Sequence, residues 1–351
     1  MYTRLMPRLK IKWIKMKLST ITINFNHKHF PKLCVEALEA SKTNFKFEII
    51  FVDNGTRDPI SKGFLEQAAK QGRIKLIKTA KNIGFSAGNN LGALNASGEY
   101  LLFLNPDTAV YPDALQKMVD YMEKYGGVEK SGVHGGKEAG AINCAEDSGM
   151  ESSTIIYSEG SGAESSAITY ADNSGAKNNK NLRGGRRDNS HEKNAKNRPI
   201  GILGPKLIYA DGVVQDSCRR FPRLIDLIAK RTILGRLPFL RKRVREYMMG
   251  DFDHEKICEP DWITGAAMLI PKKLFKKVGG FDERYFLFME DVDLCKKVRA
   301  AGYKIVYYPQ AKINHYHQRL SAGGLHKLLT KKVFWHHVAS MIKYFWKWRK
   351  G

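Results

Sequence analysis

The sequence has few cysteines, and their spacing suggests no shared site. Five stand among 351 residues, at positions 34, 144, 218, 258 and 295, and no two form a C-x-x-C pair. An odd number without such pairs argues against a disulfide framework and against a zinc cluster. Because a reducing compartment is the simplest setting for such a chain, we expect a cytoplasmic protein.

Long apolar runs are also absent. No stretch reaches the roughly 18–20 residues that a membrane-spanning helix needs. Near the N-terminus, Lys12 and Lys15 interrupt the apolar residues Ile11, Trp13 and Ile14. We therefore expect neither a spanning helix nor the apolar core of a signal peptide.

Acidic residues are missing from both ends of the chain. Residues 1–17 and 319–351 hold six and eight Lys or Arg without any Asp or Glu, and 219–247 holds ten basic residues and two acidic ones. These three segments carry net +22 of the total +24 at pH 7, so the rest is nearly neutral. Such an excess favours an anionic partner, which is nucleic acid, a phosphate-rich ligand or an anionic membrane surface.

From Leu18 onward, β-rich runs alternate with segments of helical spacing. Strands are predicted at 18–24, 45–52, 74–77 and 100–104, and helices at 30–41, 60–71, 86–96 and 112–125. This alternation predicts a parallel sheet covered by helices on both faces. Ligands bind such sheets at the carboxyl ends of the strands, which here carry Asn24–Asn26, Asp53 and Asn105–Asp107.

Residues 126–198 interrupt this pattern with a composition rich in Gly, Ser, Asn, Lys and Glu. We interpret them as a disordered low-complexity insertion, with folding on a partner as the alternative. After it, strands are predicted at 200–209, 262–270, 304–308 and 311–315, and helices at 272–278, 290–300 and 325–346. The expected organisation is a basic extension at 1–17, two halves of one domain at 18–125 and 199–320 around the insertion, and a basic amphipathic helix within 321–351.

Three strand-end motifs have both a functional and a structural interpretation. Asp53, in Val-Asp-Asn-Gly, can accept hydrogen bonds from a base or ribose, or it can belong to a plain turn. Gly84, in Asn-Ile-Gly-Phe, precedes a helix whose N–H groups can bind phosphate, or it lies in an ordinary connector. Asp107, in Asn-Pro-Asp-Thr, can hold a divalent cation on a diphosphate, or it is a solvated acid.

Two later motifs are similarly ambiguous. Glu290, Asp291 and Asp293 begin a helix, where the helix dipole stabilises acids. Crowded carboxylates also raise one another's pKa, as a general base requires. His315 follows a strand and is either a metal ligand or a surface histidine.

Together and in this order, the motifs resemble those of the family-two glycosyltransferases with the GT-A fold, and of their rhamnosyltransferase-like branch in particular. The resemblance covers roughly residues 18–125 and 199–320. The motifs that carry it are Asn24-Phe25-Asn26, Val52-Asp53-Asn54-Gly55, Asn82 through Asn90, Leu104-Asn105-Pro106-Asp107-Thr108, Gly204-Pro205-Lys206-Leu207, Asp211-Gly212, Trp262-Ile263-Thr264-Gly265-Ala266, Gly280-Phe281-Asp282 and Glu290-Asp291-Val292-Asp293-Leu294.

The resemblance implies an α/β fold with a mixed, mostly parallel sheet, and an inverting transfer from a nucleoside-diphosphate sugar to a hydroxyl. The implied donor-binding residues are Asn24, Asn26, Asp53, Asn82, Gly84, Asn89, Asn105 and Asp107. Asp107 and His315 would bind Mg²⁺ or Mn²⁺, and Asp291 would be the base, assisted by Glu290. The implied acceptor side is Trp262, Thr264, Gly265 and Asp293.

The expected product is a glycan or lipid-linked saccharide of cell-wall or other cell-surface polysaccharide synthesis, with rhamnose or another hexose transferred. Where this fold often has a first acidic metal ligand, Asn105 stands instead, so more depends on His315. A different donor or a polyprenyl-phosphate acceptor is the alternative within the family. A basic nucleic-acid-binding protein is the alternative of another class, and the near-neutral core with strand-end acids argues against it.

The C-terminal segment mixes aromatic residues and cations between Lys343 and Lys350. One interpretation is an interfacial helix that attaches the enzyme to the inner face of the cell membrane. The other is a helix packed on the domain with a solvated basic end. The sequence leaves both open.

Overall fold

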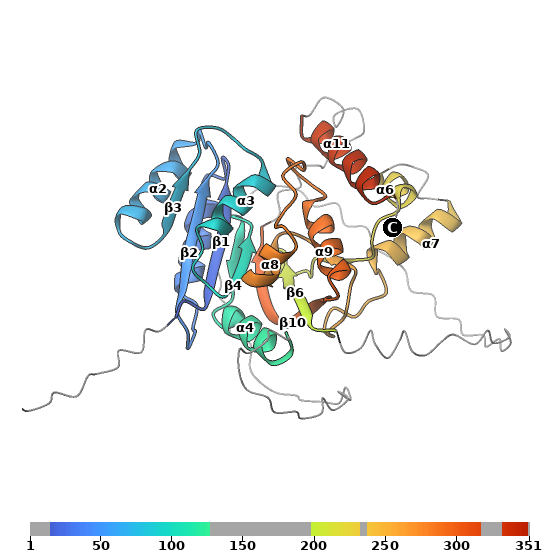
Figure 1. The fold of residues 1–351 in the computed structure, drawn as a ribbon, viewed down its shortest axis with the longest axis horizontal. Helices are drawn as coiled ribbons and strands as arrows, with labels where there is room; N and C mark the ends of the chain where they lie inside the picture. Colours follow the sequence, from blue (N-terminus) through green and yellow to red (C-terminus); the bar gives the residue numbers. More distant parts are fainter. Residues whose placement is uncertain (1–14, 127–197, 232–236, 317–331, 350–351) are drawn as a thin grey trace, which may run out of the picture. The chain divides into compact units, whose positions relative to one another are not determined.

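A computed structural model describes residues 15–126, 198–231, 237–316 and 332–349 of the chain (Figure 1). Most of the predicted extension and of the predicted insertion, and the predicted start of the C-terminal helix at residue 325, lie outside these residues. None of the described helices combines the length and apolar composition needed to cross a bilayer.

Within the described residues, eight strands form one mixed sheet in the order β3-β2-β1-β4-β9-β6-β10-β5. The strands are β1 (Leu18–Asn24), β2 (Phe47–Asp53), β3 (Lys75–Lys78), β4 (Tyr100–Leu104), β5 (Thr108–Val110), β6 (Ile200–Ile208), β9 (Ala267–Pro271) and β10 (Lys304–His315). Strands β3, β2, β1 and β4 are parallel, as are β6 and β10, whereas β9 and β5 run antiparallel to their neighbours. Two further strands, β7 (Cys218–Arg219) and β8 (Trp262–Ile263), form a small separate pair. The mixed, mostly parallel α/β sheet is thus confirmed.

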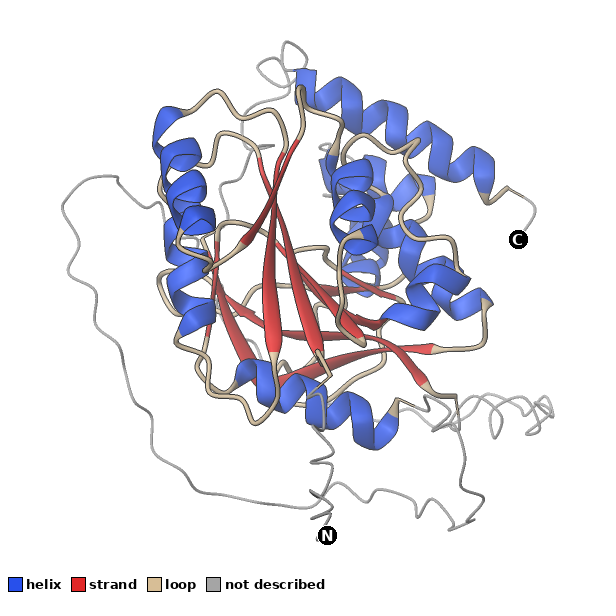
Figure 2. Cartoon of the chain, turned by 60° about the vertical axis from the view of Figure 1, so that its left-hand side comes forward, coloured by secondary structure: helices blue, strands red, loops and turns tan. Residues whose placement is uncertain are grey.

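Helices cover both faces of the sheet, as Figure 2 shows. On one face α1 (Phe30–Glu39), α2 (Pro59–Lys70) and α4 (Ala114–Tyr125) share an apolar core with alternate residues of the strands. On the other face the core includes residues of α3 (Phe85–Leu94), α8 (Lys272–Lys277), α9 (Glu290–Ala300) and α11 (Lys332–Lys347). Strands β1 and β4 are buried along their whole length, which fits their largely apolar and β-branched composition.

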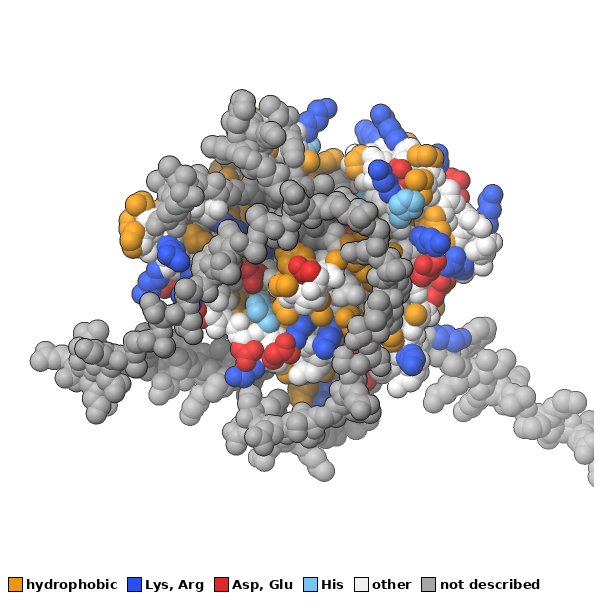
Figure 3. Space-filling model, turned by 180° about the vertical axis from the view of Figure 1, so that it is seen from behind, with side chains coloured by type: hydrophobic (Ala, Val, Ile, Leu, Met, Phe, Trp, Pro, Cys, Tyr) orange, Lys and Arg blue, Asp and Glu red, His pale blue; other side chains and the backbone are white. Residues whose placement is uncertain are grey.

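Two helices that the sequence pattern did not predict lie in the basic segment 219–247. They are α6 (Leu224–Arg231) and α7 (Pro238–Met248). These helices contain many charged residues, and only a few of their apolar side chains, such as Leu240 and Tyr247, are buried. The apolar periodicity that would predict a helix is therefore weak. At the edge of the molecule where α7 projects, hydrophobic and basic side chains lie next to each other (Figure 3).

Two strand predictions were wrong in detail. The predicted strand at 262–270 is divided between β8 and β9, because residues 264–266 leave the extended path. The two strands predicted at 304–308 and 311–315 form one strand, β10, whose register with β6 shifts between Tyr308 and Lys312. Pro309 lies in that irregularity, where a residue without an N–H is tolerated.

Candidate active site

The ends of β1 and β2 form the first part of the site. Asn24 and Asp53 are register partners on these parallel strands, and both are buried. Oδ1 of Asp53 accepts a hydrogen bond from the N–H of Thr56 at 3.0 Å, and the Thr56 hydroxyl accepts one from Nδ2 of Asn24 at 3.0 Å. Because β1 lies between β2 and β4, this edge is the point where the strand order changes direction.

Asn26 and Asn89 instead bond to backbone near them in space. Asn26 has a positive φ of 61°, and its side-chain oxygen accepts from the N–H groups of Arg57 and Asp58 at 2.8 and 3.1 Å. Asn89 is buried in α3 and donates to the carbonyl of Phe85 at 3.0 Å. In this structure both side chains stabilise the local backbone.

The glycine loop before α3 is held by an amide network. Nδ2 of Asn54 donates to Oδ1 of Asn82 at 3.0 Å, and the same oxygen accepts from the N–H of Gly84 at 2.9 Å. Gly84 has φ 91°, and a Cβ there would stand 2.9 Å from the carbonyl oxygen of Phe286. Only glycine therefore fits between this loop and the chain segment that leads to Glu290.

Asp107 and His315 lie together where β4 ends and β10 meets β5. Oδ1 of Asp107 is 3.5 Å from Nε2 of His315, which is also 3.5 Å from Nδ2 of Asn105. Burial tends to raise the pKa of Asp107, but the contact with His315 and the nearby His27 outweigh it and lower this pKa. The structure thus brings His315 to Asn105 and Asp107, which stand more than two hundred residues earlier in the sequence.

Gln215, which the sequence analysis missed, fixes the orientation of His315. Its Oε1 lies 2.8 Å from Nδ1 of His315, and its Nε2 donates to the His315 carbonyl at 2.7 Å. An amide oxygen can only accept, so Nδ1 carries the proton and Nε2 presents a lone pair toward Asp107 when the ring is neutral.

The two facing acceptors are suited to a shared cation. Oδ1 of Asp107 is buried and has no hydrogen-bond partner among the described residues. Its 3.5 Å separation from Nε2 of His315 is close to the roughly 3 Å between neighbouring ligand atoms around Mg²⁺. No cluster of three or more His, Cys, Asp or Glu fit to hold a metal occurs in the described residues. A cation here would take its other ligands from substrate or water.

Asp291 lies at the start of α9, against the break between β8 and β9. Its Oδ2 accepts from the N–H of Gly265 at 3.0 Å, and its Oδ1 accepts from the N–H of Val292 at 2.8 Å. A Cβ at Gly265 would lie 3.3 Å from that of Asp291, so the approach is close. The tertiary contact with Asp291 accompanies the break in the predicted strand.

Burial raises the pKa of both neighbouring acids. For Asp291, burial outweighs the opposing hydrogen bonds of Gly265 and Val292 and the charge of Arg219. For Glu290, burial and the charge of Asp291 raise the pKa well above its ordinary value. Oε2 of Glu290 is buried without a hydrogen-bond partner among the described residues. Such a pair retains protons at a pH where ordinary carboxylates have lost them.

The turn that delivers these acids has an unusual backbone. Phe288 and Met289 both have φ 68°, in the left-handed region that costs of order 1–3 kcal/mol for such residues. Helix α11 contacts this turn, since the hydroxyl of Ser340 donates to the Leu287 carbonyl at 2.9 Å and the rings of His337 and Phe288 lie 4.8 Å apart. The surrounding structure therefore holds the backbone in a costly conformation directly before Glu290.

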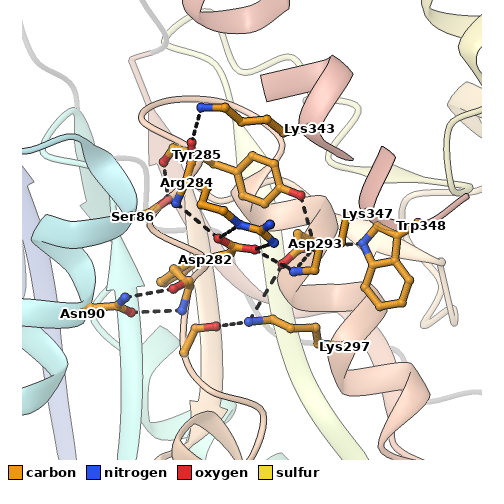
Figure 4. Close-up of polar contacts among 12 residues, drawn as sticks. Ser86, Asn90, Asp282, Arg284, Tyr285, Asp293, Lys297, Lys343, Lys347 and Trp348 are labelled. Atoms are coloured by element: carbon orange, nitrogen blue, oxygen red, sulfur yellow. Dashed lines mark hydrogen bonds and ion pairs between the residues drawn. The ribbon is translucent and has the colours of Figure 1, made fainter. Parts of the chain in front are cut away.

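The structure does not place Asp293 with the other acids of its motif. Its carboxylate is completely buried and accepts from Nζ of Lys347 at 2.8 Å and from Nε1 of Trp348 at 2.8 Å (Figure 4). Tyr285 and Lys297 lie at 3.4 and 3.8 Å. Asp293 thus anchors the end of α11 on α9, which leaves it no exposed surface for an acceptor.

Trp262 and Thr264 flank the break next to Asp291. Nε1 of Trp262 donates to the carbonyl of Arg220 at 2.8 Å, and the guanidinium of Arg219 lies 5.1 Å from the ring centroid. The hydroxyl of Thr264 is buried and has no hydrogen-bond partner among the described residues. Thr264 therefore has a polar group available beside the acid, whereas the indole N–H of Trp262 is already bonded.

One short segment links the Asp107–His315 pair to the acids. Gln215 holds His315, the carbonyl of Ser217 accepts from the N–H of Thr264 at 3.0 Å, and Arg219 acts on Asp291 through its charge. The N–H of Asn105 also donates to the carbonyl of Ala266 at 3.0 Å. This segment therefore connects the two groups, although Asp107 stands more than a hundred residues before Asp291 in the sequence.

Comparison with known proteins identifies the class. Residues 19–136 match the family model described as glycosyl transferase family 2, and residues 214–334 match that described as glycosyltransferase like family 2. The structure of GalNAc-T7 with UDP, GalNAc and Mn²⁺ is similar with a TM-score of 0.51 at 13% identity, over 87% of this chain and 44% of that one. That likeness supports the GT-A fold.

Two curated relatives are rhamnosyltransferases. The N-acetylglucosaminyl-diphospho-decaprenol L-rhamnosyltransferase of Mycobacterium tuberculosis is 38% identical over 128 residues, which are 35% of this chain and 39% of that protein. Rhamnosyltransferase WbbL of Escherichia coli is 34% identical over 84 residues, 24% of this chain and 30% of that protein. The matches thus span well under half of either relative's length. The chain belongs to glycosyltransferase family 2, in a rhamnosyltransferase-like branch.

Proposed function

We propose that this chain is an inverting hexosyltransferase. It moves rhamnose or another hexose from a nucleoside-diphosphate sugar to a hydroxyl of a glycan or lipid-linked acceptor, in the synthesis of a cell-surface polysaccharide. The observation that carries the proposal is Asp291, a half-buried acid of raised pKa, whose neighbouring segment also positions the Asp107–His315 pair.

The donor would bind at the edge formed by β1, β2 and β4. Asp53 would accept hydrogen bonds from the base or ribose, with Asn24 beside it. The network of Asn54, Asn82 and Gly84 would hold the loop that begins α3 close to the diphosphate. Asn26 and Asn89 would support this edge through the backbone that they hold.

Asp107 and His315 would hold a divalent cation, Mg²⁺ or Mn²⁺, and Gln215 would keep Nε2 of His315 directed at it. When bound, such an ion stabilises the negative charge of a leaving diphosphate. The lone-pair arrangement described above supports this assignment, and it leaves the choice of ion open.

Asp291 would remove the proton of the acceptor hydroxyl as that oxygen attacks the anomeric carbon from the face opposite the diphosphate. The N–H of Gly265 fixes one of its oxygens. Desolvation raises the pKa of Asp291 toward the range that suits a base at neutral pH, and Glu290, whose charge is disfavoured by burial, would assist beside it. Thr264, Gly265 and Trp262 would line the acceptor side next to Asp291.

The named activity of the M. tuberculosis relative supports a lipid-linked acceptor, which is presented at a membrane surface. The proposal therefore includes peripheral contact of the enzyme with an anionic leaflet.

A screen of nucleoside-diphosphate sugars tests the proposal. Purified full chain would be assayed for nucleotide release and for transfer to polyprenyl-diphosphate-linked saccharides, with and without a chelator. We expect one or a few donors to be consumed only when the divalent cation is present. Turnover of no nucleotide sugar under any of these conditions would contradict the proposed function.

A further inference from the structure

Helix α11 has two faces of different character. Its inner face is buried at Ser340 and Tyr344 and is fixed to the domain through Lys347 (Figure 4). Its outer face leaves large hydrophobic side chains in solvent, since Ile342 and Trp346 are each 63% exposed.

The exposed residues form a stripe. At about 100° per residue, Trp335, Ile342 and Trp346 lie within about 40° of one another around the helix. Trp335 is 57% exposed, so large apolar groups reach the surface along most of the helix. We call these three residues the outer stripe. Ser340 and Tyr344 occupy the contact with the domain instead.

Cations flank the outer stripe, and α11 itself contains no acid. Lys332, Lys343 and Arg349 are exposed, and the guanidinium of Arg349 lies 4.1 Å from the ring centroid of Trp346. Residues 319–351 contain no Asp or Glu. Aromatic rings between cations are typical of helices that lie at the headgroup level of a bilayer.

A second set of exposed apolar residues lies on α6 and α7. Leu224 and Ile225 are 49% and 40% exposed, and Phe239 is 65% exposed. Residues 219–247 carry a net charge of +8. This segment meets α11 at Lys296, whose Nζ lies 4.6 Å from the ring centroid of Trp348 and 5.8 Å from that of Phe221.

We propose that the outer stripe of α11, together with the apolar residues of α6 and α7, docks on an anionic lipid leaflet. Charge complementarity favours this occupant, because two copies of so basic a surface repel each other. Nucleic acid would use the cations and the aromatic rings, but it gives no reason for the exposed isoleucine and leucine side chains. On this proposal, the inner face of α11 packs on the domain and its outer face lies at the membrane surface. Each of the two interpretations of the C-terminal helix then applies to one face.

Vesicle binding of the full chain tests this surface. Sedimentation with phosphatidylglycerol vesicles and with pure phosphatidylcholine vesicles would compare wild type, the double variant I342A/W346A and Leu94→Ala. Leu94 is 77% exposed at the end of α3 and is the matched control. We expect salt-sensitive binding that prefers phosphatidylglycerol, falling roughly tenfold in the double variant and unchanged in Leu94→Ala.

Equal binding of both vesicle types, or full binding by the double variant, would overturn the inference. Loss of a wild-type dimer in the double variant, measured by light scattering, would assign the surface to a second copy instead. Donor consumption in detergent-free solution should be the same in all three proteins. A failure of membrane binding is therefore distinguishable from a failure of the proposed transfer reaction.

Discussion

Removing the amine of Lys347 should destabilise the protein more than is usual for a partly exposed lysine. Asp293 has no solvent access, and Lys347 is the cation in hydrogen-bond contact with it. Breaking a buried pair by deleting one partner costs about 3–5 kcal/mol, because the remaining charge stays buried. Trp348 at 2.8 Å and Lys297 at 3.8 Å still oppose that charge, so we expect Lys347→Met to lose about 3 kcal/mol, near the lower end.

Chemical denaturation, followed by circular dichroism, measures this loss, with Lys343→Met as the control. Lys343 is exposed and, within the part of the chain that the structure describes, donates only to the carbonyl of Arg284, so its replacement should cost less than about 0.5 kcal/mol. Adding Asp293→Asn to Lys347→Met should recover part of the loss, since it removes the unpaired charge. Equal stability of the two lysine variants would refute the reasoning.

The remaining predictions concern the site. Gln215→Leu should weaken binding of Mn²⁺ to the donor-loaded protein by roughly 10- to 100-fold in calorimetry, because His315 loses the partner that orients it; unchanged affinity would remove Gln215 from the site. Gly84→Ala should lower the melting temperature and the transfer rate, whereas Gly63→Ala, in an open position of α2, should raise stability by up to about 1 kcal/mol; equal effects would contradict the close approach to Phe286. Glu290→Gln should stabilise the protein increasingly as the pH rises above 4.5, because the folded state raises the pKa of Glu290 and thus disfavours its charged form. A stability difference that is constant between pH 4 and 8 would show that Glu290 has no raised pKa.

Local sequence patterns predicted those strands and helices whose own residues carry a clear signal of burial or of helix ends. The runs at 18–24 and 100–104 are strands in the structure with the same ends, because each is a largely apolar or β-branched segment that is buried between two helical layers. The helix at 290–300 also agrees at both ends, since acids favour its first turn and basic residues its last. The parallel half of the sheet follows from this alternation.

Other features of the structure depend on contacts between residues that are distant in the sequence, and local patterns could not predict them. The break at 264–266 depends on contacts with Asp291 and Ser217, and neither leaves a local signal. Gln215 has no charge and belongs to no motif, so its bonds to His315 were invisible before the strands were placed. Asp293 is the opposite case. Its motif predicted an acid on the acceptor side, whereas in the structure its carboxylate is bonded to Lys347 and Trp348 at the end of α11.

The structure brings Asp53, Asp107, His315 and Asp291 to one edge of the sheet region, but their roles remain predictions. The positive charge by itself allowed nucleic acid as readily as an anionic membrane. It lies at the termini and in residues 219–247, and the chain belongs to a family of glycosyltransferases.

The most direct measurement is transfer by Asp291→Asn, beside donor binding by the same protein. With the donor identified by the screen, we expect the variant to bind donor as wild type does and to transfer sugar roughly 100- to 10,000-fold more slowly. Asp251→Asn, an exposed acid paired with Arg245, is the control and should keep full activity. Undiminished transfer by Asp291→Asn would contradict the assigned base and the mechanism built on it.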